Sequence, residues 1–162
     1  MTKQEIYNNA LGLNDEEFVK WGEKYATGIG LIDDQHRRLV ILTNQLYHAC
    51  FAGDEVLGTV FKEAMSRMVE YVRFHFTAEQ NLLEKINYPK WAEHKNKHDA
   101  LVKDILETAK EYNEGRKFVP NHFTRLLRDW VFSHIAVEDH IYAKYIQDQI
   151  KKGLLSESQL SI

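Results

Sequence analysis

The chain lacks several features that mark common classes of protein. It holds one Cys and two Pro among 162 residues, and nowhere does it reach the run of about 18 apolar residues that a membrane span needs. The first ten residues lack the apolar core of a secretory signal peptide. Cys50 cannot form a disulfide within the chain, which fits a reducing compartment. We therefore expect a cytoplasmic protein that does not cross a membrane.

An excess of charge of one sign is also absent. The 21 Lys and Arg residues nearly balance the 24 Asp and Glu residues, for a net charge of −3. These charges are mixed along the chain, so there is no basic stripe for nucleic acid and no polybasic membrane tag. The length suits one domain that buries roughly two thirds of its unfolded surface. We expect neither nucleic acid nor a membrane among its partners.

Apolar residues recur at the 3.6-residue period of a buried helical face in four long segments. The segments run from near Ile32 to Cys50, from about Glu55 to Ile86, from about Lys90 to Tyr112, and from Pro120 to about Ile150. Short turns separate them, at 52–54, 87–89 and 114–117. No segment has the alternating pattern of a strand. The sequence therefore predicts an all-α protein, an up-down-up-down four-helix bundle.

The two ends of the chain show weaker patterns. Residues 1–20 contain Ile6, Leu11, Leu13 and Phe18 among polar residues, which predicts an N-terminal arm or a short helix. The glycine-containing stretch 21–30 reads as extended or irregular chain. We assign the four-helix domain to residues 21–150. We assign residues 151–162 to a C-terminal tail, in which Gly153 is a plausible helix stop and Leu154 to Ile162 are expected to be frayed.

A set of His and carboxylate residues repeats one spacing along these helices. His94 and His98 are four residues apart, so both imidazoles leave the same face of a helix and can bind one metal ion. A lone pair of this kind also occurs by chance on solvated helices. Here His75 and Glu79 repeat the spacing. With three further residues, the four helices supply five His and two carboxylates, a metal-site pattern: His36, His75, Glu79, His94, His98, His134 and Asp139.

The remaining His residues and the Cys are not expected to ligate metal. Cys50 lies on the apolar stripe but about 21 Å along the helix from His36, so it is expected to be a small core residue. His48 and His122 are expected on the solvated surface. His140 is adjacent to Asp139 and points about 100° away from it on a helix. Met65 and Met68 stand among aliphatic neighbours, as core-filling residues do.

His134 and Asp139 are five residues apart, which is one too many for a regular helix. On a straight α-helix their side chains would diverge by about 140°. If both are to reach one metal centre, the helix must either widen to π-type geometry between them or reorient Asp139 through its side-chain torsions. We predict one of these two arrangements.

These motifs together resemble those of the hemerythrins, specifically the bacterial single-domain members. The similarity extends from about Trp21 to about Tyr145, through W-x14-H, D-x-Q-H, H-F-x2-E, Y-P-x4-H-x3-H and W-V-x2-H-I-x3-D. In that family the seven positions ligate two iron ions. The resemblance implies one iron held by His94, His98 and His134, and the other by His36 and His75. It further implies that Glu79 and Asp139 bridge both irons beside an oxo or hydroxo group.

The same resemblance implies a function. With three shared bridging oxygens, the three-His iron is six-coordinate and the two-His iron has one open position, where dioxygen binds in the family. Trp130, Val131 and Ile135 resemble the apolar wall of the family's oxygen pocket, although ordinary core residues would look the same. Donor types alone leave zinc and manganese open.

The leading interpretation is reversible dioxygen binding for storage, delivery or sensing, without catalysis. The alternatives are a di-iron oxidase or peroxidase, which would act on dioxygen, peroxide or nitric oxide, and an iron-handling protein with labile metal. Ferritin-like oxidases build their sites from Glu and Glu-x2-His motifs. The His-rich set here favours binding. A sensing role would need a separate partner protein, since we find no fused sensor domain.

Overall fold

The structure is a computed structural model and describes residues 17–50, 54–116 and 119–161, with the side chains of 54–57 excepted. These ranges are mainly helical and contain no strand. The main helices are α2 (Gly30–Ala49), α3 (Asp54–Lys85), α4 (Trp91–Asn113), α5 (Val119–Trp130) and α6 (Asp139–Lys151). A π-helical segment, η2 (Val131–Glu138), joins α5 to α6, and two 3-10 turns, η1 (Glu23–Tyr25) and η3 (Glu157–Leu160), flank the set.

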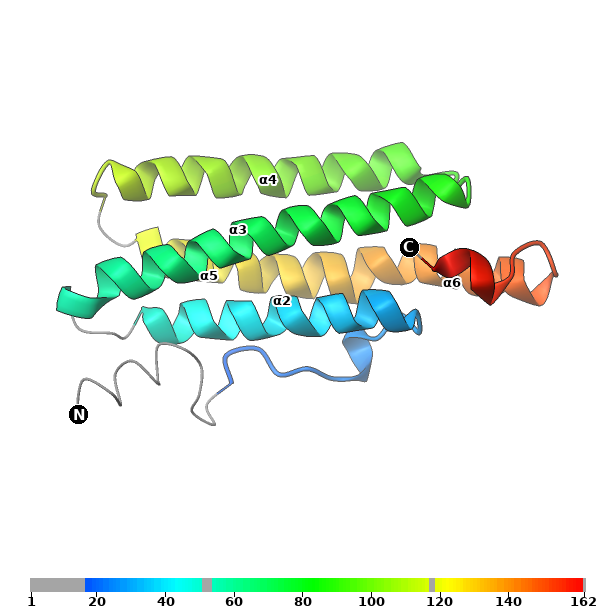
Figure 1. Ribbon diagram of the computed structural model, residues 1–162, viewed down its shortest axis with the longest axis horizontal. Helices are drawn as coiled ribbons and strands as arrows, with labels where there is room; N and C mark the ends of the chain where they lie inside the picture. The colour runs from blue at the N-terminus through cyan, green and yellow to red at the C-terminus, as the bar shows by residue number, and fades with distance from the viewer. Residues whose placement is uncertain (1–16, 51–53, 117–118, 162) are drawn as a thin grey trace.

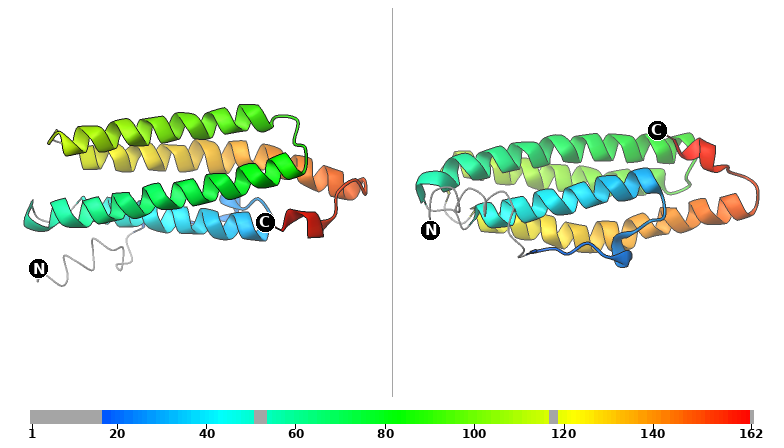
Figure 2. Two further views of the ribbon diagram at one scale, coloured as in Figure 1. Left: turned by 45° about the horizontal axis from the view of Figure 1, so that its top comes forward. Right: turned by 60° about the horizontal axis from the view of Figure 1, so that its bottom comes forward.

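Successive helices run side by side in opposite directions along the long axis of the molecule (Figures 1 and 2). The α5, η2 and α6 segments follow one another as a single rod and form the fourth member of the bundle (Figure 1). The predicted up-down-up-down four-helix bundle is therefore confirmed. The helix bounds differ from the predicted ones by one or two residues.

The turns between helices follow the residues that cannot continue a helix. Asn87 has a positive φ of 52° after α3, and Pro89 follows two residues later. Gly115 (φ 76°) and Gly153 (φ 69°) take the same left-handed conformation after α4 and α6. Glycine is favoured there because it has no Cβ to clash with the backbone. Pro120 is the second residue of α5, in the first helical turn as predicted.

The core consists of two apolar clusters, one on each side of a buried polar layer. Along α2, Ile32 belongs to one cluster and Leu39 to the other, with the buried His36 between them. Along α3, Phe76 and Leu82 flank the buried Glu79 in the same way. The polar residues are thus enclosed by apolar layers above and below them in the bundle.

Of the two arrangements predicted between His134 and Asp139, the structure shows the π-helical widening. The amide of Asp139 donates to the carbonyl of His134, five residues earlier, in place of the usual four. The extra residue per turn brings both side chains to the inner face, and both are buried. π-helical turns are rare and often occur at functional sites.

Part of the N-terminal arm lies within the described residues. The ring of Phe18 stacks on Tyr47, with centroids 4.1 Å apart. The amide of Val19 donates to Asn44 Oδ1 at 2.8 Å, and Asn44 Nδ2 donates back to the Val19 carbonyl at 2.9 Å. Residues 17–20 therefore cover the outer side of α2. Ile6, Leu11 and Leu13, like residues 51–53 and 117–118, lie outside the described residues.

The expected frayed tail after Gly153 is wrong. The chain reverses at Gly153, and η3 packs Leu155 and Leu160 against the apolar cluster at the end of the bundle. Ser156 and Gln159 form a reciprocal capping box that holds this turn. Lys85 Nζ donates to the Ser161 carbonyl at 3.0 Å, which fastens the C-terminal segment to α3. Partial burial of the two Leu side chains stabilises a segment that the local sequence pattern alone predicts to be a tail.

The expected solvent exposure of His48 is also wrong, because His48 is buried. Helix α2 is covered by α3, by α5 and by the segment around Phe18, so its buried arc is wider than one stripe.

Cys50 is partly buried, and its thiol lies 3.3 Å from the Leu46 carbonyl and 3.4 Å from Thr124 Oγ1. Its placement as a core residue, away from the polar layer, is confirmed. Within the described ranges, no helix has the length and apolarity needed to cross a bilayer.

The entry into α2 depends on one buried carboxylate. Asp33 Oδ1 accepts hydrogen bonds from the amide and the hydroxyl of Thr27, each at 2.7 Å, and Oδ2 accepts from the Gly28 amide at 3.1 Å. These bonds fix the chain that precedes the helix carrying His36. Asp34, the next residue, is exposed and pairs with Arg37 at 2.7 Å.

We predict that Asp33→Ala lowers the free energy of unfolding of the metal-free protein by about 2–3 kcal/mol, because it leaves three donors without their acceptor. Asp34→Ala is the control and should change it by less than about 1 kcal/mol, because an exposed ion pair contributes little. Urea unfolding followed by circular dichroism measures both. Equal losses would contradict the role given to Asp33.

Candidate metal centre

The seven residues singled out from the sequence meet at one level of the bundle. His36 comes from α2, His75 and Glu79 from α3, and the other four from α4, η2 and the first residue of α6. All seven are buried. Their ligand atoms form two groups, in each of which the atoms lie within 4.8 Å of one another: Glu79, His94, His98, His134 and Asp139 in one, and His36, His75, Glu79 and Asp139 in the other.

The larger group has three imidazole nitrogens facing the two carboxylates. His98 Nε2 lies 2.9 Å from His134 Nε2 and 3.1 Å from Glu79 Oε2. His94 Nε2 lies 3.3 Å from Glu79 Oε2 and 3.4 Å from Asp139 Oδ1. His134 Nε2 is 3.0 Å from Asp139 Oδ1. Three nitrogens and two oxygens therefore converge on one small volume.

The smaller group uses the other side of the same carboxylates. His36 Nε2 lies 3.2 Å from Asp139 Oδ2, and His75 Nε2 lies 3.9 Å from Glu79 Oε2. Glu79 and Asp139 thus belong to both groups. Two groups that share two carboxylates can hold two metal ions with the carboxylates between them.

Several buried atoms in this layer have no hydrogen-bond partner. They are His36 Nδ1 and Nε2, His75 Nε2, and both carboxylate oxygens of Asp139. A buried polar atom without a partner is destabilising unless another group satisfies it. Cations between the imidazole nitrogens and the carboxylates would satisfy all but the outward-facing His36 Nδ1. The donor set therefore fits bound metal.

The two carboxylates are held in their ionised form. Burial alone would raise the pKa of Glu79, but His75, His94 and His98 hold it well below its ordinary value. Burial and the charge of Glu79 would likewise raise the pKa of Asp139, but the nearby imidazoles of His134 and His36 hold it below its ordinary value. Ionised carboxylates are the forms that bind metal.

The imidazoles divide into two kinds. Burial lowers the pKa of His75 to about 3 and lowers the pKa of His98, so both are neutral at pH 7. Burial would also lower the pKa of His36 and His94, but the nearby carboxylates of Asp139 and Glu79 raise the pKa of each above its ordinary value. His36 and His94 therefore keep a proton to higher pH than His75 and His98 do when no metal is bound.

A second layer of side chains orients the ligand residues. His75 Nδ1 donates to Gln35 Oε1 at 2.9 Å, which directs His75 Nε2 toward the centre. His98 Nδ1 lies 3.2 Å from the Gln80 amide. The buried Tyr142 hydroxyl donates a short hydrogen bond to Glu79 Oε1. Outer partners of this kind fix the tautomer and orientation of metal ligands.

Sequence reasoning missed these three outer residues, although weak signals were present. Gln35 precedes His36 within the D-x-Q-H motif, and Gln80 follows Glu79 directly. Tyr142 lies three residues after Asp139, and so on the same face of α6. Uncharged polar residues on an inner helix face have many roles, so none of these signals would have been specific.

The residues predicted as a pocket wall lie around His134. Val131 and Ile135 are buried in the larger apolar cluster, and Trp130 packs against that cluster. The Trp130 ring stacks on His134, with centroids 4.5 Å apart, and its indole N–H is buried without a partner. Trp130 therefore lies directly beside His134, a residue of the polar layer.

The other His residues stay outside both groups. His122 is exposed. His140 Nδ1 donates a hydrogen bond to the Ile135 carbonyl at 3.1 Å, so this imidazole contacts the backbone of the π-helical segment. Neither contributes an atom to the two groups found among the described residues.

Comparison with known proteins identifies the relatives of this fold and site. The family model described as the hemerythrin HHE cation binding domain matches residues 27–146. The chain belongs to the hemerythrin family. The matched range holds all seven residues of the polar layer.

Its relatives include proteins named bacteriohemerythrin. That of Stenotrophomonas maltophilia is 31% identical over 134 residues, which cover 83% of this chain and 82% of the relative. That of Pseudomonas aeruginosa is 30% identical over 146 residues, covering 85% of this chain and 93% of the relative. The crystal structure of a wild-type hemerythrin matches with a TM-score of 0.72 at 28% identity, over 78% of this chain and 96% of that one.

We predict that the three-His group holds its metal more tightly than the two-His group, because it has one more imidazole donor. His98→Ala should therefore lose iron more completely than His36→Ala, while His122→Ala keeps the parent's content. Iron counting after dialysis against a chelator measures this. Equal iron retention in the first two variants would contradict the asymmetry.

Proposed function

We propose that this hemerythrin-family chain binds dioxygen reversibly at a non-haem di-iron centre. The proposed ligands are His94, His98 and His134 for one iron, His36 and His75 for the other, and Glu79 and Asp139 as bridges. The observation that carries the proposal is the pair of shared, buried carboxylates with unpartnered donor atoms around them. Family membership supports iron as the metal.

The unequal number of imidazoles supports a small-molecule site. The two groups share Glu79 and Asp139, but one adds three His residues and the other only two. The two-His side therefore has one protein donor fewer, and a small molecule can bind there. When bound, a pair of ferrous ions supplies the two electrons that dioxygen takes up on binding and returns on release.

The surroundings of the layer suit release of dioxygen unchanged. Apolar clusters on both sides exclude bulk water, and the proposed wall residues Trp130, Val131 and Ile135 carry no carboxyl group that could donate a proton. Exclusion of water and acid slows the loss of reduced oxygen species from such a site. The absence of a membrane-spanning helix in the described ranges is consistent with a cytoplasmic protein that stores, delivers or senses dioxygen.

A di-iron oxidase or peroxidase is the second candidate. Such enzymes of the ferritin-like type use mainly carboxylate ligands, including Glu-x2-His motifs. The layer here has five imidazoles and two carboxylates. A donor set rich in neutral imidazole favours binding over oxidation.

The test is optical. The iron-loaded protein is reduced under anaerobic conditions, mixed with dioxygen, and then purged with inert gas. We expect a coloured adduct that forms on mixing and disappears on purging over several cycles, with two irons retained per chain. Oxidation of the iron at the first exposure, without release of dioxygen, would replace the binding role by an enzymatic one.

A single substitution tests the apolar wall. Val131→Glu would place a carboxyl group beside the layer, where it could ligate iron or donate a proton, so the reversible adduct should be lost with both irons retained. Val131→Gln is the control, because it has the same size without the acid, and should keep more of the reversible binding. Stopped-flow mixing with dioxygen and iron counting give the answer. If the Val131→Glu variant still binds and releases dioxygen as the parent does, Val131 does not line the dioxygen pocket.

A further inference from the structure

The polar layer lies inside the bundle, so a metal ion can reach it only through the side chains around it. Apolar clusters close the layer toward both ends of the bundle. Of its seven proposed ligands, His94 has the largest exposed fraction, 5%, and the other six are at most 3% exposed. The layer therefore comes closest to solvent at His94, on helix α4.

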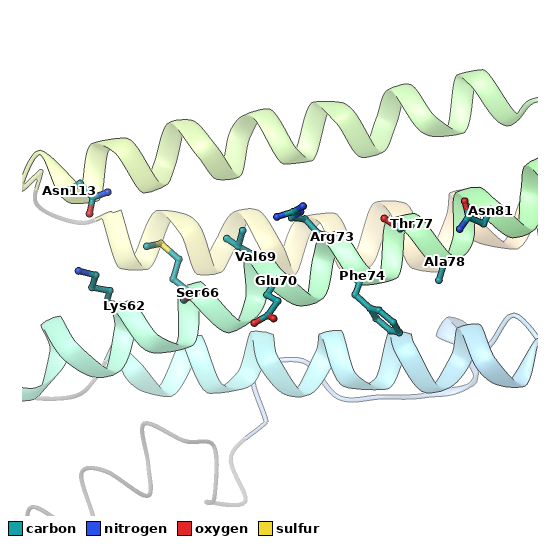
Figure 3. A pocket seen from close by; sticks show the side chains of 11 residues that line it. Lys62, Ser66, Val69, Glu70, Arg73, Phe74, Thr77, Ala78, Asn81 and Asn113 are labelled. Carbon is teal, nitrogen blue, oxygen red and sulfur yellow. The ribbon is translucent and has the colours of Figure 1, made fainter. Parts of the chain in front are cut away.

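A small surface hollow beside His94 reaches this layer. Its lining includes His94 itself and the charged side chains of Glu93, Lys97 and Glu138. Two larger hollows do not lead to the layer, because none of its residues lines them. They are the groove of about 960 Å³ along α3, which Figure 3 shows, and a hollow of about 480 Å³ at the end of the bundle.

An ion pair closes the hollow beside His94. Lys97 Nζ donates a hydrogen bond to Glu138 Oε2, which links α4 to η2, and it lies 3.7 Å from Glu93 Oε1. The volume that remains is about 20 Å³, which is room for about one water molecule. A hydrated divalent ion is larger than this, so Lys97 must move before such an ion can reach His94.

The sequence explains why these charges stand beside the ligands. Each of the three charged residues directly precedes one of the proposed ligands, and successive helical residues point roughly a quarter of a turn apart. When the ligand points inward, its neighbour therefore lies at the edge of the helix, next to solvent. The three neighbouring pairs are Glu93 and His94, Lys97 and His98, and Glu138 and Asp139.

The ion pair can open without disturbing the fold. The side chains of Lys97 and Glu138 are 36% and 27% exposed. Water can solvate both groups when they separate, and ion pairs at the surface contribute little to stability. Opening therefore needs only a rotation of two side chains, while the helices that carry the ligands stay in place.

The position of the hollow favours metal over dioxygen as the species that passes. His94 belongs to the three-His group, whereas the position proposed for dioxygen is on the two-His side. Carboxylate oxygens bind divalent cations. A cation that displaces the Lys97 ammonium would meet the carboxylates of Glu93 and Glu138 first and His94 next.

We propose that Lys97 and Glu138 form a gate through which divalent metal ions enter and leave the polar layer. When the pair is closed, it covers His94 and slows the loss of metal. When it is open, His94 is accessible and both carboxylates are free to attract a cation. This inference rests on the metal centre of the proposed function but not on dioxygen binding.

The kinetics of metal exchange test the gate. A gate changes the barrier and not the end states, so Lys97→Gln should speed Fe²⁺ loading and Fe²⁺ release equally and leave the affinity unchanged. We expect a factor of about 5 in each rate, which corresponds to the about 1 kcal/mol of an exposed ion pair. Lys97→Arg keeps the pair and should exchange metal at the parent's rates. Anaerobic stopped-flow mixing with Fe²⁺, and then with a chromophoric chelator, measures both directions.

The control is Lys103→Gln, which breaks the exposed ion pair of Lys103 with Glu107, 3.9 Å apart on the same helix. It removes the same charge about 14 Å along α4 from His94 and should leave both rates unchanged. Release that rises alone, with a loss of affinity, would show that Lys97 only stabilises the site. That result, or unchanged rates in Lys97→Gln, would overturn the gate.

Dioxygen binding separates this inference from the proposed function. Iron-loaded Lys97→Gln should bind dioxygen at the parent's rate, and a faster rate would overturn the assignment of the hollow to metal. A parent that exchanges Fe²⁺ as expected but forms no dioxygen adduct would refute the proposed function and leave the gate standing. A parent that binds no Fe²⁺ would refute the metal centre and the gate together.

Discussion

The structure depends on keeping two carboxylates and five imidazoles away from water at one level of a helical bundle. Isolated buried charges are very unfavourable, and they are tolerated only when opposite charges or metal ions lie beside them. Glu79 and Asp139 are completely buried, so every imidazole around them contributes to their stabilisation. The rest of the fold supplies what this layer needs: apolar clusters on both sides and backbone positions that face inward.

Helix geometry satisfies that constraint in two ways. On α3 and α4 the regular four-residue spacing directs pairs such as His94 and His98 to one face. In the fourth member of the bundle, His134 and Asp139 are five residues apart, and the π-helical segment η2 turns the Asp139 side chain inward. The outer residues Gln35 and Tyr142 then hold individual ligands in place. Backbone distortion and side-chain hydrogen bonds together serve the same seven side chains.

Much of this could be predicted from the sequence because the relevant signals are local. Helix bounds follow from the 3.6-residue period and from breakers such as Pro89. The spacing of His134 and Asp139 limits their helix to two arrangements, a π-helical segment or a reoriented Asp139 side chain. Burial that depends on distant segments could not be predicted in this way. His48 is covered because several elements surround α2, and the C-terminal segment is ordered because Leu155 and Leu160 meet an apolar surface formed by other helices. The metal ligands themselves stay a prediction.

The most direct test of the central claim is a crystal structure of the iron-loaded protein with anomalous scattering measured at the iron edge. Our account predicts two anomalous peaks inside the polar layer, both within about 2.2 Å of oxygens from Glu79 and Asp139. One peak should have His94, His98 and His134 as neighbours, and the other His36 and His75. A single peak, or two peaks that do not share the carboxylates, would contradict it.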